Sequence, residues 1–252
     1  MLRICCLLIC SLYSSFYCRA EPLHVYCEDW PSFCTPASEG VYVDILRKIY
    51  EPHGYQIEIH IVAYKRALTQ IKNKTGDIAL GVYHGEVQGV LEGHYPDSAD
   101  DVVVYMLKKW QPEWKGEESL RDQMVLWQKG WAYDKDITVP MIWRETDSYQ
   151  QALKLIEKNR YRYYISVGAL HLDEPPPEIA KVFWRWENTY PIFADTEQGG
   201  KLRKLWDTEM YRLIHQGTLA DIYRRYQLHD YYRSFFKSLE QHPKKEGSNQ
   251  SL

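Results

Sequence analysis

The chain has 252 residues, of which 45% are hydrophobic and 26% are charged, and its formal net charge at neutral pH is −3. These proportions are typical of a packed globular protein and exclude a disordered chain. The small excess of acidic residues argues against a nucleic-acid-binding protein, which needs a basic face. Aromatic residues are abundant, with 21 Tyr and 9 Trp, and they supply large contact areas that can carry a polar group.

The N-terminal segment has the pattern of an export signal. Arg3 precedes an apolar run over residues 4–12, and residues 18–20 end in a small residue as a cleavage site does. The apolar run is too short to cross a bilayer as a stable helix, and no later stretch has the length and apolarity of a membrane span. We therefore expect a signal peptide over residues 1–20 and an exported, periplasmic protein that contacts a membrane at its surface at most. A lipid anchor on Cys18 is the alternative.

Only Cys27 and Cys34 remain after the predicted signal peptide. Exported proteins meet oxidising conditions, and the short segment between the two residues can form a closed loop, so we expect a disulfide. Two buried thiols are the alternative. Two cysteines without a neighbouring cluster of histidines give no support to a zinc site, and we expect neither a metal nor a cofactor.

The first predicted elements alternate between strand and helix. Residues 23–27 form a predicted strand, followed by a polar and aromatic loop over 28–33. Residues 40–50 have apolar side chains on one helical face, and Gly54 ends that helix. Residues 55–62 alternate between polar and apolar, which predicts a half-exposed strand.

The segment 63–82 is the stretch around which the site is expected. It reads as a loop, a short helix with one apolar face, a tight turn and a buried strand over 78–82. Its continuous apolar strand is typical of a parallel sheet covered on both faces. Strand-helix-strand units of this kind bind ligands at the carboxyl ends of their strands, where this chain carries Tyr64, Arg66, Gly81, Tyr83 and His84.

The second half continues the pattern. Residues 85–101 look irregular and polar, and Asp147 is the expected N-cap of a helix that follows it. The clearest helical region is 200–226, interrupted at Gly217, and we expect a short docked helix after residue 228 and disorder from about residue 242. Further strands are predicted over 102–107, 124–127, 141–144, 161–167, 182–186 and 190–194.

Several of these segments match motifs of one family. Residues 40–46 (GVYVDIL) resemble its G-x-x-x-D-[IL]-[LM] first helix, and residues 64–67 with 76–81 (YKRA and GDIALG) resemble its W-x-R-A and G-x-x-D-x-x-x-G motifs. Residues 206–226 resemble its closing helical motif. Over about residues 22–228, the order and spacing of these motifs resemble solute-binding protein family 3, the type II periplasmic binding proteins of amino-acid-type ABC transporters.

The resemblance implies an α/β fold of two lobes, each a mostly parallel sheet flanked by helices, with a ligand bound between them. Lobe 1 would comprise residues 21–107 and 190–228, lobe 2 residues 108–189, and residues 229–252 a partly disordered C-terminal tail. The protein would be a monomer, it would not be an enzyme, and its partners would be a small polar ligand and an ABC permease.

Two departures from the family pattern bear on the ligand. Family members that bind α-amino acids carry an Arg after the G-x-x-D strand, whereas residues 84–89 contain none. They also carry an Asp after the strand of lobe 2, whereas residues 165–168 contain none. A buried carboxylate needs a charged or bidentate partner, so we expect a ligand other than a standard α-amino acid.

The candidate ligand-binding residues lie in loops and at strand ends. Aromatic side chains can stack on a ligand, arginines can pair with an anionic one, and a helix start supplies amide donors. Loop packing and structural ion pairs are the alternatives for these side chains. The candidates are Trp30, Phe33, Tyr64, Arg66, Tyr83, His84, Trp131, Tyr133, Arg144 and Thr146.

The sequence thus predicts an exported solute-binding protein for ABC-type uptake or sensing. A diverged sensor or accessory protein with the same fold is one alternative. A small-molecule lyase that uses Glu28 and Asp29 as acid and base is another. The chain lacks the G-x-S-x-G, H-E-x-x-H and P-loop motifs, so we do not expect an enzyme.

Overall fold

The computed structural model describes residues 21–171 and 173–236. The predicted signal peptide, the alternative lipid anchor on Cys18 and the expected disorder from about residue 242 lie outside the described residues. Among the helices of the described ranges, none has the length and apolarity needed to cross a membrane.

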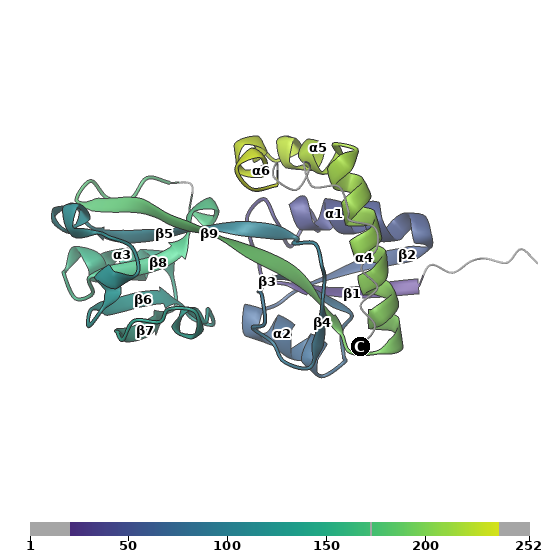
Figure 1. The fold of residues 1–252 in the computed structure, drawn as a ribbon, viewed down its shortest axis with the longest axis horizontal. Helices are drawn as coiled ribbons and strands as arrows, with labels where there is room; N and C mark the ends of the chain where they lie inside the picture. The colour runs from purple at the N-terminus through teal and green to yellow at the C-terminus, as the bar shows by residue number, and fades with distance from the viewer. Residues whose placement is uncertain (1–20, 172, 237–252) are drawn as a thin grey trace, which may run out of the picture.

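Two lobes are joined by two long antiparallel strands, β5 (Ser98–Leu107) and β9 (Ile179–Ala194) (Figure 1). The strand order is β2-β1-β3-β9-β5-β8-β6-β7, so one path of hydrogen-bonded strands runs through both lobes. The pairing of β5 with β9 extends from Ser98 opposite Thr189 to Leu107 opposite Ile179. The sequence-based expectation of a two-lobed α/β fold is confirmed.

Lobe 1 is built on three strands, β1 (Glu21–Cys27), β2 (Tyr55–Ile61) and β3 (Ile78–Tyr83), in which β1 pairs in parallel with both neighbours. Parallel strands must be covered on both faces. The helices α1 (Val41–Tyr50) and α4 (Glu197–His215) cover one face and α2 (Tyr64–Lys72) covers the other (Figure 1). The main core lies under α1 and α4, where Leu23, Val25 and Trp206 are almost fully buried.

Lobe 2 repeats this arrangement on a smaller scale. Strand β6 (Met124–Gln128) pairs in parallel with β7 (Ile142–Thr146) and β8 (Tyr163–Val167), and α3 (Tyr149–Glu157) packs on the sheet. Short 3-10 helices cover Glu51–His53, Lys108–Glu113, Glu118–Leu120, Tyr133–Lys135 and Gly168–Leu170.

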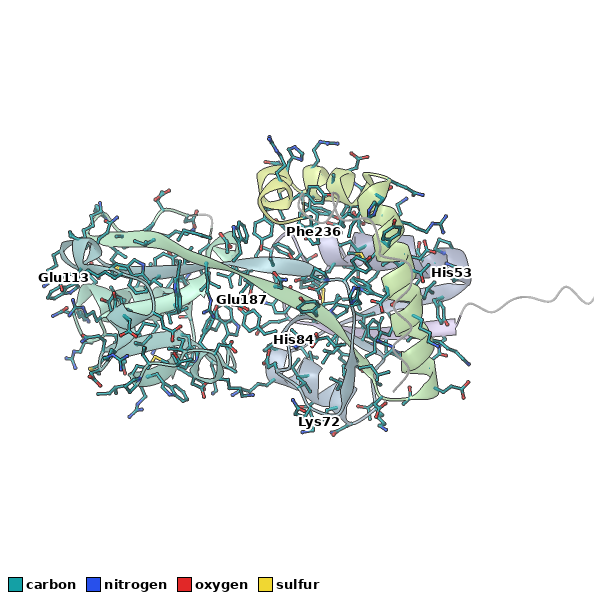
Figure 2. All side chains as sticks on the ribbon, in the orientation of Figure 1. His53, Lys72, His84, Glu113, Glu187 and Phe236 are labelled. Carbon is teal, nitrogen blue, oxygen red and sulfur yellow. A yellow bond between two sulfur atoms is a disulfide. The ribbon has the colours of Figure 1, made fainter. Side chains whose placement is uncertain are left out.

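The lobe boundaries predicted from the sequence stay a prediction. We propose that the chain crosses between the lobes near Asp100 and Glu187, which face each other in the ladder of β5 and β9. Figure 2 places Glu187 between the two lobes.

Three details differ from the sequence-based expectations. The predicted strands 182–186 and 190–194 are one strand, because the polar residues between them still pair with β5. The segment expected to be irregular contains β4 (Val90–Glu92), which pairs with β9. The helix α3 is capped by Ser148, whose Oγ accepts a hydrogen bond from the Gln151 N–H at 3.2 Å, rather than by Asp147.

The C-terminal helices pack on lobe 1. The predicted helical region divides at Gly217, which adopts a left-handed conformation between α4 and α5 (Thr218–Arg225). The helix α6 (His229–Phe235) follows and contacts α5 (Figure 1). The predicted docked helix is therefore present.

Cys27 and Cys34 form the expected disulfide, and both residues are almost fully buried. The bond closes the loop that follows β1. That loop carries Trp30 and Phe33, so the disulfide restricts the segment that presents these two aromatic rings.

Reduction of this disulfide is expected to lower the free energy of unfolding by about 2–3 kcal/mol, because a cross-link removes loop-closure entropy from the unfolded chain. Urea unfolding with and without a reductant measures the effect. A variant with Cys27→Ala and Cys34→Ala is the control and should be insensitive to the reductant. A wild-type protein whose stability is unchanged by reduction would contradict the prediction.

Candidate ligand-binding site

A cavity lies between the two lobes. Its atom-free space is about 510 Å³, a figure that includes the part open to solvent. Both lobes contribute side chains. The lining residues are Trp30, Phe33, Tyr42, Tyr64, Gly81, Tyr83, Glu86, Asp100, Trp131, Ala132, Val167 and Leu170.

Aromatic rings form the wall contributed by lobe 1. The Trp30 ring lies in an edge arrangement on Tyr42, with 6.2 Å between centroids, and 5.9 Å from the Tyr64 ring. The Trp30 main chain is held by hydrogen bonds to Cys34 across the disulfide loop. Tyr42 belongs to the first turn of α1 and Tyr64 to the first turn of α2. Helix starts and the disulfide loop thus bring these rings together.

Gly81 allows this wall to form. The register of β3 against β9 shifts between Ala79 and Val82, and Gly81 adopts a φ of +72° there. A Cβ on Gly81 would lie 2.9 Å from the Trp30 ring, which is closer than carbon atoms approach. A glycine is therefore required both by the backbone conformation and by the position of Trp30.

A carboxylate reaches the cavity from the strand that joins the lobes. Asp100 Oδ2 accepts a hydrogen bond of 2.7 Å from the Tyr83 hydroxyl, which also lies 3.3 Å from the Tyr133 hydroxyl. Burial raises the pKa of Asp100 to about 7, although the hydrogen bond from Tyr83 acts in the opposite direction. The carboxylate therefore changes charge near neutral pH.

A second carboxylate, that of Glu86, lies on the other side of Tyr83. Its Oε2 accepts hydrogen bonds from the Tyr64 hydroxyl at 2.7 Å and from the Tyr83 main-chain N–H at 3.3 Å. Burial raises the pKa of Glu86 as well. Among the described residues that line the cavity, none is Lys, Arg or His. The cavity is consequently aromatic and acidic.

A third carboxylate, Asp97, is fully buried behind the cavity and does not line it. Its Oδ2 accepts a hydrogen bond of 2.8 Å from the Gly81 N–H, and its Oδ1 accepts one of 2.6 Å from the Thr189 hydroxyl. Burial raises the pKa of Asp97 to about 6. This residue ties β3 to β9 directly beside the site.

Lobe 2 closes the cavity. Trp131 lines it and packs against the apolar residues around α2 in lobe 1. An ion pair between Lys65 on α2 and Glu145 on β7 spans the two lobes, with 3.4 Å between Nζ and Oε1. The two lobes are therefore in contact around the cavity.

Five of the ten candidate residues line the cavity, namely Trp30, Phe33, Tyr64, Tyr83 and Trp131. Tyr133 lies behind them and contacts the Tyr83 hydroxyl.

The other four candidates lie outside the cavity, and their ligand-binding role stays a prediction. Arg66 is exposed, because the buried residues of α2 place it on the outward face of the helix. His84 is exposed at the edge of lobe 1 and contacts Glu92 (Figure 2). Arg144 is exposed on β7, and Thr146 is buried with its hydroxyl 3.1 Å from the Gln151 side chain.

Three lining residues that decide the character of the site were not predicted from the sequence. Tyr42 lies within a helix that was read only for its apolar face. Glu86 and Asp100 lie in the segment 85–101, which was read as irregular. The available signal was the position of Glu86 in the segment where the family resemblance implies an Arg.

No protein-family model matches the sequence, and no curated protein matches it. The structure is similar to solved proteins of one fold. A mutant of ArgBP from T. maritima superimposes with a TM-score of 0.65 at 15% identity, over 83% of this chain and 96% of that one. AbpA from Streptococcus pneumoniae, an amino acid ABC transporter substrate-binding protein bound to L-arginine, gives 0.64 at 14% identity, over 89% and 98%. This chain has the two-lobed type II periplasmic binding protein fold.

A third similar structure is an ancestral amino acid-binding protein, AncCDT-1, described as a precursor of cyclohexadienyl dehydratase. It has a TM-score of 0.63 and 14% identity, over 81% of this chain and 95% of that one. Glu28 and Asp29, the acid and base of the lyase alternative, are not among the residues that line the cavity. At these identities the similarity establishes the fold alone.

Gly81→Ala is expected to lower the free energy of unfolding by about 1–3 kcal/mol through backbone strain. The contact between the new Cβ and the Trp30 ring should lower it further. Gly54→Ala is the matched control, since Gly54 also has a positive φ, of +87°, but its Cβ would meet nothing within 4 Å. Urea unfolding compares the two variants. Equal losses would contradict the inferred contact with Trp30.

Asp100→Asn is expected to stabilise the unliganded protein at pH 8 and to stabilise it less at pH 5. The pKa of Asp100 is about 7 in the folded protein, against an ordinary value of 3.8. The folded state therefore favours the protonated form. Stability is lost as the pH rises through 7, because the buried carboxylate then becomes charged. Urea unfolding of both proteins at the two pH values tests this. A gain that does not change with pH would contradict it.

Proposed function

We propose that this protein is an exported solute-binding protein that captures a small organic cation between its lobes, for ABC-type uptake or for sensing. One observation carries the proposal: the described lining of the cavity contains two carboxylates and no positively charged side chain.

The charge of the cavity favours a cation. Burying a charged carboxylate without a positive partner costs free energy. The pKa of such a group therefore rises, because burial favours the neutral form. Burial raises the pKa of both Asp100 and Glu86. Lys135 lies close enough to Glu86 to act against the rise of its pKa, but it is not among the lining residues. A bound cation would supply a positive partner inside the cavity and would favour the ionised form of both carboxylates.

The aromatic walls support the same class of ligand. A cation over the face of a tryptophan or tyrosine within about 6 Å is attracted by the ring, and the attraction grows when water is excluded. Trp30 and Trp131 approach the cavity from opposite lobes, so closure would place a ligand against both.

A standard α-amino acid fits this cavity poorly. Its carboxylate would face Asp100 and Glu86 and would meet no Arg or Lys from the described lining. This agrees with the ligand expected from the sequence, and it narrows that ligand to an amine or quaternary ammonium compound without a carboxylate.

Closure supplies a signal that a partner can recognise. In hinge proteins, ligand binding favours the closed arrangement of the domains. We propose that β5 and β9 act as the hinge and that the contact between Lys65 and Glu145 forms on closure. A monomer with an ABC permease as its partner would use this signal for uptake, and a sensor would use it without a permease.

Small organic cations are expected to raise the melting temperature. A ligand at 100 times its Kd adds about 2.7 kcal/mol, which corresponds to about 5–10 °C for a protein of this size. A thermal-shift panel would compare choline and simple alkylamines with L-arginine, L-glutamate and dicarboxylates. Shifts with the anions alone, or with no compound of the panel, would contradict the proposal.

Three variants test whether the cation that raises the melting temperature binds in the cavity. Asp100→Asn should abolish the shift, whereas Glu92→Gln, which removes a carboxylate outside the cavity, should retain it. The shift should also grow between pH 6 and pH 8, because Asp100 then becomes charged. A shift that is unchanged by Asp100→Asn and also by Glu86→Gln would place the ligand elsewhere.

A further inference from the structure

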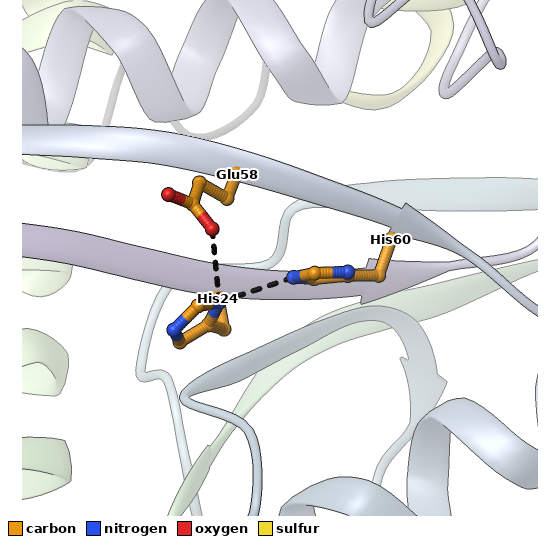
Figure 3. A group of neighbouring side chains, drawn as sticks. All are labelled: His24, Glu58 and His60. Atoms are coloured by element: carbon orange, nitrogen blue, oxygen red, sulfur yellow. Dashed lines mark hydrogen bonds and ion pairs between the residues drawn. The ribbon is translucent and has the colours of Figure 1, made fainter.

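Three side chains with metal-binding atoms meet on the outer strands of lobe 1, away from the cavity. His24 belongs to β1, and Glu58 and His60 belong to β2. The parallel register places His24 opposite Glu58 and Tyr26 opposite His60. Since alternate residues of a strand share a face, the three side chains project from the same side of the sheet (Figure 3).

The distances between their donor atoms match those of a metal site. His24 Nδ1 lies 3.1 Å from His60 Nε2 and 3.4 Å from Glu58 Oε2. In a tetrahedral zinc site with bonds of about 2.0–2.1 Å, neighbouring ligand atoms are about 3.3 Å apart. One donor atom from each residue lies within 4.8 Å of the others.

The supporting contacts hold two of the ligands in place. The His60 ring stacks on Tyr26, with 4.7 Å between centroids and 19° between planes. The main-chain N–H of His24 donates a hydrogen bond of 2.8 Å to Asp77 Oδ2. Ligands on paired strands are positioned more accurately than ligands on loops.

The surroundings leave room for the remaining ligands of a metal. The His24 and Glu58 side chains are 40% and 43% exposed, so water can complete the coordination. The opposite face of these strands packs against the core under α1. None of the three residues lines the cavity between the lobes.

We propose that His24, Glu58 and His60 form a Zn²⁺ site. Two neutral imidazole nitrogens and one carboxylate oxygen are a ligand set that zinc accepts, with water in the open position. The ion would link β1 to the edge strand β2. This proposal does not depend on the ligand of the cavity.

Isothermal titration of the purified protein with Zn²⁺ alone at pH 7.5 tests the site. The wild type should bind one ion at this site, and His60→Ala, His24→Ala and Glu58→Gln should each weaken that binding at least about tenfold. His53→Ala is the matched control and should bind as the wild type does. His53 also lies beside a carboxylate, that of Glu209 at 3.7 Å, but has no second histidine.

Circular dichroism should confirm that each variant is folded. The near-isosteric Glu58→Gln keeps the test decisive if a histidine variant does not fold. A wild type with no binding at 1 mM Zn²⁺ would overturn the proposal and leave an ordinary His–Glu contact. Unchanged binding by Glu58→Gln and both histidine variants would also overturn it.

Discussion

The fully buried carboxylate of Asp97 connects the parts on which the site depends. It accepts hydrogen bonds from Gly81 on β3 and from Thr189 on β9, and it immediately precedes β5. A buried charge without a positive partner must be satisfied by such donors. Asp97 therefore fixes the position of the two joining strands relative to the end of β3. Because Asp100 follows three residues later, the same anchor places the acidic group of the cavity.

The aromatic walls of the cavity and its two carboxylates act against each other in the unliganded protein. Its aromatic walls exclude water, which raises the pKa of Asp100 and Glu86 and lowers stability when these groups are charged. The same exclusion of water strengthens their attraction for a cation. Asp100 lies on a strand that passes between the lobes, so a ligand that pairs with it also contacts the hinge. If β5 and β9 act as the proposed hinge, Asp100 would couple binding to closure.

The sequence predicted the order of helices and strands, because that order follows from local periodicity, and the resemblance of its motifs to a known family implied the two-lobed fold. It divided β9 into two strands, since the polar residues before Pro191 resemble a turn until their pairing with β5 is known. The charge of Arg66 predicts a contact with an anionic ligand, but the helix turns this side chain outward. The proximity of His24 to Glu58 and His60 depends on the parallel register, which no single segment reveals. Contacts between distant segments were therefore the part that local patterns could not supply.

We propose that a cation binds between the lobes beside Asp100 and Glu86. A crystal structure of the protein with the organic cation that stabilises it most tests this directly. We expect the nitrogen between Trp30 and Trp131, at about 3–4 Å from a carboxylate oxygen or over a ring face. A ligand bound elsewhere, or an anionic group facing the two carboxylates, would contradict it.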